Sequence, residues 1–131
     1  MSEEGAVRGV IVAHGAMARG LIDAVRCIAG DAADRLVPVS NDGKGPEQLR
    51  VELESALGPG PAVIFVDLRR GSCGMAALYS CKDRARRAVV SGVNLPMLLD
   101  FVFHRDLPLE ELADRLVEKG RAAIDRPLSG R

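Results

Sequence analysis

Residues 62–66 read Ala-Val-Ile-Phe-Val, and the acidic residue Asp67 follows them directly. The run is apolar at every position instead of alternating with polar residues, which is typical of a strand covered on both faces. A strand of this kind lies inside a sheet that helices pack against from two sides. We therefore take this stretch as the centre of the predicted fold.

Three more short apolar runs predict further strands, at residues 7–13, 36–39 and 86–91. Between and after the strands, apolar residues recur every three or four positions, which is the period of an amphipathic helix. The predicted helices cover residues 16–28, 47–57, 73–82, 95–105 and 108–124. Strands that alternate with helices form a mainly parallel sheet, because right-handed crossovers return each strand in the same direction. The predicted fold class is an α/β three-layer sandwich with four strands.

Length and composition exclude several classes of function. The chain has 131 residues, with 18 Lys and Arg against 18 Asp and Glu, which fits one domain and argues against a protein built to bind nucleic acid. With one Tyr, three Phe and no Trp, it lacks the rings of a base-stacking platform. Three cysteines without a Cys-x-x-Cys pair argue against a disulfide framework or a zinc site. The acidic N-terminus and the lack of a long apolar window lead us to expect a cytoplasmic protein.

The position of a candidate site follows from the predicted topology, since ligands of parallel sheets bind beyond the carboxyl ends of the strands. Four segments meet at this edge, namely residues 14–15, 40–44, 67–72 and 92–94. Two of these segments begin with side chains that can do chemistry, His14 and Asp67, each directly after a strand. A carboxylate beside an imidazole holds the ring in one tautomer and leaves the other nitrogen as a nucleophile.

Gly71 and Ser72 stand just before a predicted helix, whose N-terminal N–H groups attract an anion. A nucleophilic histidine, a carboxylate that orients it and a small anion cradle together indicate phosphoryl transfer through a phosphohistidine. Serine hydrolysis, with Ser72 as nucleophile and His14 as base, is a weaker interpretation because the G-x-S-x-G elbow is missing. Cys73 is either a thiolate at the helix N-terminus or a small packing residue, and the second is the commoner role.

Three motifs, in this order along the chain, resemble a known family. They are Ile11-Val12-Ala13-His14-Gly15, then Phe65-Val66-Asp67 with Gly71-Ser72 and Ala76-Ala77, and Ser91-Gly92-Val93-Asn94-Leu95-Pro96-Met97-Leu98. Over essentially the whole chain they are similar to the enzyme IIA component of the mannose, fructose and sorbose family of the bacterial sugar phosphotransferase system (PTS). The segment from Gly92 to Leu98 is the most specific of them, because no generic physical requirement produces it.

The resemblance implies a single domain over residues 1–131 that acts as a phosphotransferase with a phosphohistidine intermediate. The phosphocarrier protein HPr would phosphorylate His14 and a PTS IIB component would accept the phosphoryl group, with no metal or other cofactor. Asp67 would hydrogen-bond the ring. The resemblance also implies which residues contact the phosphoryl group, namely Gly15, Gly71 and Ser72. Through these protein partners alone, the chain would associate with a membrane permease.

Members of this family add one antiparallel strand near the C-terminus, and some form dimers by exchanging that strand. In this chain only residues 126–131 remain to supply it. The resemblance therefore adds two expectations, a fifth antiparallel strand and a homodimer.

The segment after Asp67 departs from the family pattern. The family usually has an aromatic or apolar residue and a glycine before Gly-Ser, and often proline and asparagine after it. This chain reads Leu68-Arg69-Arg70-Gly71-Ser72-Cys73-Gly74-Met75 instead. Arg69 and Arg70 would favour an anionic group or an acidic partner, unless both simply point to solvent. Asn94 is a further candidate for partner contact.

Two further functions are left open. One is a regulatory phosphoprotein that HPr phosphorylates and that signals the phosphorylation state of the PTS without sugar transport. The other is a phosphatase-like or dihydroxyacetone-kinase-associated carrier that uses the same histidine. Neighbouring genes discriminate among the three functions. Adjacent IIB, IIC and IID genes favour transport, their absence favours regulation, and adjacent kinase subunits favour the last function.

Overall fold

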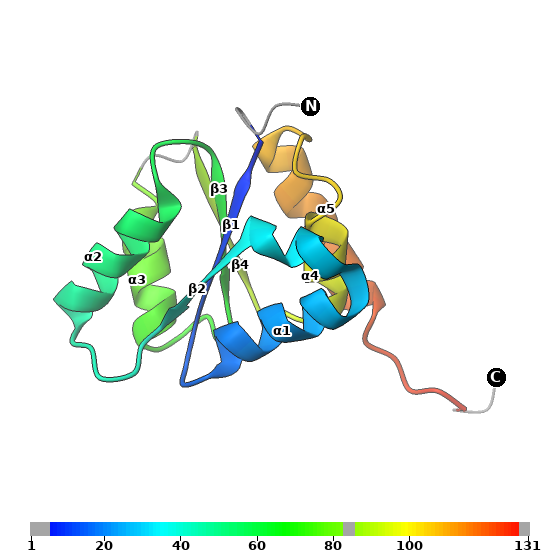
Figure 1. The fold of residues 1–131 in the computed structure, drawn as a ribbon, viewed down its shortest axis with the longest axis horizontal. Helices are drawn as coiled ribbons and strands as arrows, with labels where there is room; N and C mark the ends of the chain where they lie inside the picture. Colours follow the sequence, from blue (N-terminus) through cyan, green and yellow to red (C-terminus); the bar gives the residue numbers. More distant parts are fainter. Residues whose placement is uncertain (1–5, 83–85, 129–131) are drawn as a thin grey trace.

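A computed structural model describes residues 6–82 and 86–128 of the chain. These residues form one sheet of four strands, β1 (Arg8–Ala13), β2 (Leu36–Ser40), β3 (Ala62–Val66) and β4 (Arg87–Ser91). The strands lie in the order β2-β1-β3-β4, and every neighbouring pair is parallel (Figure 1). The parallel sheet predicted from the alternating pattern is confirmed.

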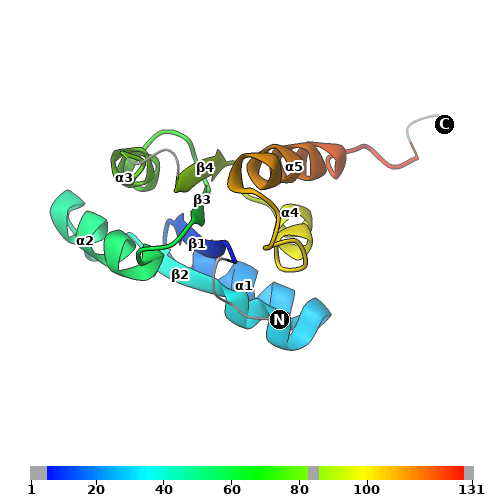
Figure 2. The same ribbon diagram turned by 90° about the horizontal axis from the view of Figure 1, so that it is seen from above.

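Helices cover both faces of the sheet and make the three layers seen in Figure 2. On one face lie α2 (Pro46–Leu57) and α3 (Ser72–Ser80). On the other face lie α1 (Met17–Ala29), α4 (Leu95–Phe101) and α5 (Leu109–Ala122). A short 3-10 helix, η1 (Gly30–Arg35), connects α1 to β2. The sequence does not predict η1, because this polar segment has no apolar period.

The position of β3 explains its unbroken apolar run. All five of its residues are buried. Val63 and Phe65 pack into the core under α1, α4 and α5, and the other three pack into the core under α2 and α3. The Phe65 ring meets the Phe101 ring of α4 edge to face, with the ring centroids 5.2 Å apart. A fully buried apolar side chain of this size contributes about 1.5–3 kcal/mol to stability. Because β3 places such side chains in both cores, it stabilises the packing of both helix layers on the sheet.

The helix predicted over residues 95–105 ends earlier, at Phe101. The residues after it turn back to the start of β1, where the Val7 N–H donates to the Arg105 carbonyl (2.9 Å). In return, Arg105 Nε donates to the Val7 carbonyl (2.9 Å). A continued helix would carry Arg105 away from both contacts, so a tertiary interaction ends α4.

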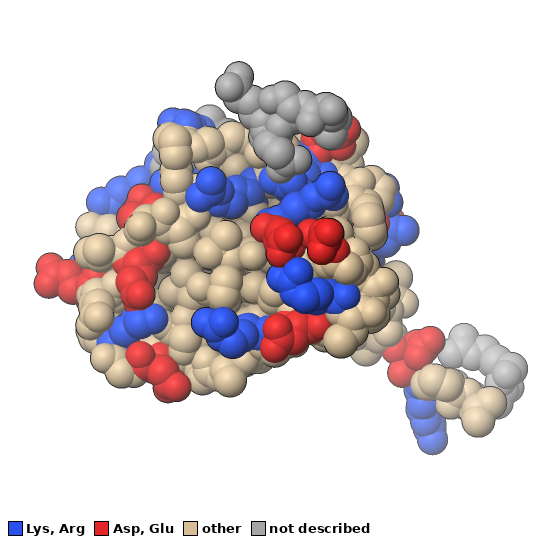
Figure 3. All heavy atoms as spheres, viewed as in Figure 1, with Lys and Arg blue, Asp and Glu red and all other residues tan. Residues whose placement is uncertain are grey.

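Beyond α5 the chain leaves the body of the domain (Figure 1). Residues 123–128 form turns and irregular chain, so they do not make the expected fifth antiparallel strand. Residues 129–131, which that strand would also use, lie outside the described residues. Within the described part of the chain, no helix has the length and apolar character needed to cross a membrane. On the face shown in Figure 3, basic and acidic side chains intermingle.

Candidate functional site at the carboxyl edge of the sheet

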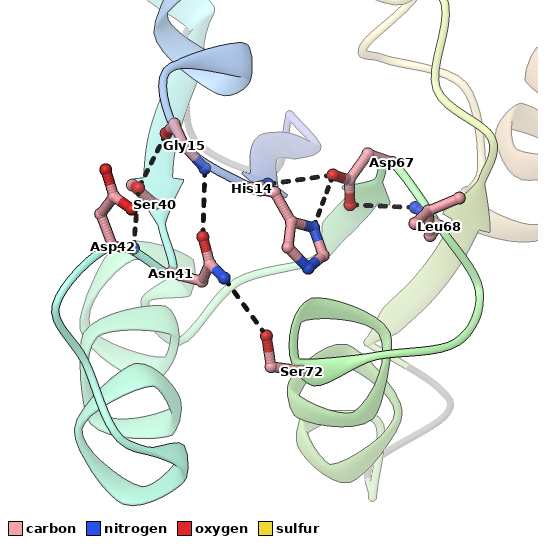
Figure 4. A network of polar contacts seen from close by, with 8 residues as sticks. All are labelled: His14, Gly15, Ser40, Asn41, Asp42, Asp67, Leu68 and Ser72. Atoms are coloured by element: carbon pink, nitrogen blue, oxygen red, sulfur yellow. Dashed lines mark hydrogen bonds and ion pairs between the residues drawn. The ribbon is translucent and has the colours of Figure 1, made fainter.

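The turn that follows β1 places His14 at the carboxyl edge of the sheet. Gly15 has a φ of +59°, a conformation that favours glycine, and it lets the chain turn from β1 into α1. The end of β2 and the loop after it hold this turn from the side (Figure 4). There the Gly15 N–H donates to Asn41 Oδ1 (3.1 Å), and Ser40 Oγ donates to the Gly15 carbonyl (2.8 Å). Hydrogen bonds between two neighbouring strand ends therefore set the position of His14.

Asp67, directly after β3, contacts His14 at two points. Its Oδ2 accepts a hydrogen bond from the His14 backbone N–H (2.9 Å) and lies 2.8 Å from the ring nitrogen Nδ1. Its Oδ1 accepts a hydrogen bond from the Leu68 N–H (2.9 Å). The Asp67 side chain is 8% exposed, whereas the His14 side chain is 43% exposed. The structure thus joins the two predicted residues as a buried carboxylate and an accessible ring.

The hydrogen bonds to Asp67 decide its charge. Burial by itself raises the pKa of Asp67, but the hydrogen bonds from the His14 backbone, the His14 ring and the Leu68 backbone together leave the pKa below its ordinary value. Asp67 is therefore ionised at neutral pH and can only accept hydrogen bonds. From this network we assign the proton of the neutral ring to Nδ1. The lone pair then lies on the other ring nitrogen, Nε2.

Nε2 faces the start of α3. A Cβ atom on Gly71 would lie 3.8 Å from Nε2 and 3.7 Å from the ring carbon Cε1, so the missing side chain keeps the space beside the ring open. Gly71 also has a φ of +105°, which side-chain-bearing residues rarely adopt. Ser72 begins α3, and its hydroxyl accepts a long hydrogen bond from Asn41 Nδ2 (3.5 Å). Nε2, Gly71 and Ser72 therefore border one small space at a helix N-terminus.

Two predicted site residues have other contacts in the structure. The Gly15 N–H, expected to contact a phosphoryl group, already donates to Asn41, so Gly15 holds the turn and offers no open donor. Asn94, expected to contact a partner, caps α4 by accepting from the Met97 N–H (3.2 Å) and donates to the Gly120 carbonyl of α5 (3.0 Å). Both ends of the Asn94 amide are thus used inside the domain, and we assign it to the packing of α4 on α5.

Arg69 and Arg70 lie on the loop between β3 and α3, and both are exposed. Neither side chain forms a hydrogen bond or an ion pair with any residue in the described ranges 6–82 and 86–128. The loop between Asp67 and Gly71 therefore presents two cations to solvent, where a second molecule can reach them.

Cys73, in the first turn of α3, is fully buried. Burial, and then the negative charge of Asp67, raise the pKa of its thiol. In the protein without a bound metal ion, Cys73 therefore packs as a neutral thiol and is not a nucleophilic thiolate. The Cys73 sulfur nevertheless lies close to the site, since its Sγ, a ring nitrogen of His14 and a carboxylate oxygen of Asp67 are all within 4.8 Å of one another.

Asn41 is the residue of this site that the sequence does not reveal. The segment 40–44 is predicted at the correct edge, but nothing in it distinguishes Asn41 from its polar neighbours. Its side chain joins the His14 turn to the start of α3, by accepting from Gly15 and donating to Ser72. A contact of this kind depends on the conformation of three loops, which no periodic pattern encodes.

Comparison with known proteins identifies the family and the fold of the chain. The family model EIIA-man, described as the PTS system fructose IIA component, matches residues 9–119. A PTS component EIIA from Streptococcus agalactiae has a similar structure (TM-score 0.84, 23% identity, covering 92% of this chain and 96% of that one). So does a mannose/sorbose-specific IIA subunit from Enterococcus faecalis (TM-score 0.82, 23% identity, 92% and 94%). At these identities the structures establish the fold. A search of curated proteins finds no match.

Proposed function

The chain belongs to the EIIA-man family of PTS IIA components, and from this premise we propose that it carries a phosphoryl group on His14. HPr is the proposed donor, and a PTS IIB component is the proposed acceptor. The protein would thus act as a phosphotransferase through a phosphohistidine. We propose that one domain, residues 1–131, contains the residues of this site.

The observation that carries the proposal is the contact between His14 Nδ1 and Asp67 Oδ2 (2.8 Å), which leaves Nε2 on an exposed ring. In the transfer step, the Nε2 lone pair attacks the phosphorus atom of the phosphorylated donor. The bond from phosphorus to the donor nitrogen breaks, and its electron pair stays on the donor. The ring becomes positively charged as the new bond forms, and ionised Asp67 stabilises that charge through Nδ1–H.

The start of α3 suits the incoming group. A phosphoryl group on histidine carries about two negative charges near neutral pH, and the free N–H groups of a helix N-terminus favour an anion. Gly71 leaves room for it beside the ring, and the Ser72 hydroxyl borders the same space. We propose Gly71 and Ser72 as its contacts, with positioning and charge doing the catalytic work.

The site is open, as a carrier that meets two proteins in turn requires. The His14 side chain is 43% exposed, and Arg69 and Arg70 are exposed on the loop that joins Asp67 to Gly71. We propose that these two arginines contact the protein partners. Coulomb attraction to an acidic partner surface would orient the encounter without enclosing the phosphoryl group.

The proposal is tested by phosphorylation with labelled phosphoenolpyruvate, enzyme I and HPr. His104 provides a matched control histidine, because its Nδ1 contacts the Asp100 carbonyl (2.7 Å) within the fold, away from the site. The wild type and the His104→Ala variant should both acquire an acid-labile label, and the His14→Ala variant should acquire none. Equal labelling of the wild type and His14→Ala would overturn the proposal.

A regulatory phosphoprotein remains the second candidate, and the exposed Arg69 and Arg70 favour it, because they depart from the family pattern next to the reactive histidine. A regulatory protein would accept the label from HPr but would not pass it to a IIB component. Adding a purified IIB protein to the labelled chain separates the two functions. Transfer of the label supports the carrier, and a label that stays on His14 supports the regulator.

A further inference from the structure

We infer that the His14 site also binds a thiophilic divalent cation, of which Zn²⁺ is the best match, through His14, Asp67 and Cys73. Three different elements supply these ligands: the turn after β1, the end of β3 and the first turn of α3. Binding of the cation does not rest on the proposed function. Its consequence, that the cation and the phosphoryl group exclude each other, does rest on it.

The donor set carries the inference. Zn²⁺ in proteins takes thiolate, imidazole and carboxylate ligands, and His14, Asp67 and Cys73 offer one of each. Their ligand atoms lie within 4.8 Å of one another. Ligands on a tetrahedral Zn²⁺ are separated by about 3.5 Å, given metal–ligand bonds of about 2.0–2.3 Å. Small side-chain rotations would therefore bring the three atoms onto one ion and leave a fourth position for water.

The existing contacts permit such a movement. Asp67 is anchored by two backbone N–H groups, from His14 and Leu68. Within the described residues, its Oδ1 accepts only the Leu68 N–H and has a further lone pair for a metal, and Oδ2 gains one when the His14 ring turns away from it. The His14 ring is exposed enough to turn toward the ion. Cys73 is fully buried and the His14 side chain is exposed, so the cation would enter from the His14 side and displace the thiol proton into solvent. Mg²⁺, which prefers oxygen ligands, does not suit a sulfur donor.

A bound cation would stop phosphoryl transfer in either of its two arrangements. If it takes Nε2, it occupies the nitrogen that attacks the phosphorus atom. If it takes Nδ1, it replaces the hydrogen bond with Asp67 that prepares the ring. The cation would therefore act as an inhibitor of the site and not as its cofactor.

The first experiment needs no phosphoryl donor. The unphosphorylated protein is titrated with Co²⁺, whose bond to a thiolate gives a charge-transfer band, and the Co²⁺ is then displaced by Zn²⁺. The band should appear in the wild type and in the Cys27→Ala and Cys81→Ala controls, and it should be lost in Cys73→Ala. The His14→Ala variant changes a partly exposed side chain, and it should lose at least about tenfold in Zn²⁺ affinity. A band that survives in Cys73→Ala, or an affinity unchanged in His14→Ala, would overturn the inference.

The second experiment tests the competition. Purified phospho-HPr is mixed with the protein in a single turnover, with and without Zn²⁺. Zn²⁺ should slow labelling of the wild type and should not change the labelling of Cys73→Ala relative to the same variant without Zn²⁺. Equal slowing of both proteins would overturn the competition. Absence of label without Zn²⁺ would instead refute the proposed function, and it would leave the Co²⁺ result untouched.

Discussion

Asp67 Oδ2 accepts the backbone N–H of His14 at 2.9 Å and lies 2.8 Å from Nδ1 of the same residue. One oxygen atom therefore holds both the main chain and the ring of His14. Because Asp67 is buried at the end of β3 and is also bound to the Leu68 N–H, the direction of the ring is set by the sheet. Several consequences of this two-point contact can be measured.

Replacing Asp67 by Asn tests the contact while it keeps the size of the side chain. The amide carries no charge, so it cannot stabilise a positive ring as the carboxylate does. We expect the single-turnover rate from phospho-HPr to fall at least about 10- to 100-fold, the range found when a carboxylate that orients a metal-bound histidine is removed. Thermal unfolding of the same protein is the control. A rate that is unchanged, or one that falls only in proportion to the unfolded fraction, would contradict the assigned role.

Replacing Gly71 by Ala tests the space beside Nε2. The added Cβ would lie 3.7–3.8 Å from the His14 ring, at a φ of +105°. We expect a loss of about 1–3 kcal/mol in the free energy of unfolding from backbone strain, together with slower labelling. Gly20→Ala is the matched control, since Gly20 lies in α1 with nothing near its added Cβ. That change should stabilise the protein by about 0.5–1 kcal/mol. Urea denaturation that ranks the two variants the other way would refute the strain argument.

The sequence predicts the pairing of His14 with Asp67, because two apolar runs end in these residues and parallel strands bring such ends to one edge. It does not predict that Asp67 also binds the His14 backbone, or that Asn41 holds Gly15. These contacts depend on loop conformations, for which a sequence pattern of period two or 3.6 carries no information. The early end of α4 has the same origin, since it follows from the contact of Arg105 with Val7 at the other end of the chain.

Reversing the charge of Arg69 and Arg70 together tests whether they contact an acidic partner surface. In the Arg69→Glu/Arg70→Glu protein, we expect transfer from phospho-HPr to slow about tenfold at low salt, and the difference to shrink as salt screens the attraction. Arg121→Glu/Arg126→Glu is the control. It makes the same change of charge at exposed residues in and just beyond α5, which is not part of the site, so it should leave the transfer rate unchanged.

Phosphorylation by phosphoramidate, a small chemical donor, separates partner binding from chemistry in this variant. Phosphoramidate has no protein surface to recognise, so it should label His14 equally in the wild type and in Arg69→Glu/Arg70→Glu. If the variant reacts slowly with both donors, the arginines act on the phosphoryl group and not on the partner. If it reacts normally with both, they contact neither.

The ion pair between α4 and α5 predicts how stability depends on pH. Asp100 accepts hydrogen bonds from Arg115 Nε (2.7 Å) and Nη2 (3.0 Å). Burial raises the pKa of Asp100, but the hydrogen bonds and charge of Arg115, together with the charges of His104 and Lys119, outweigh it and the pKa is lowered. The contribution is therefore present above the unfolded-state pKa of about 3.9 and is lost as pH falls through the lower folded value. Asp100→Asn should cost about 1 kcal/mol at pH 7, with the deficit closing in acid, whereas Asp114→Asn should cost nothing. A deficit in urea denaturation that is independent of pH would show that packing, and not charge, supplies the stability.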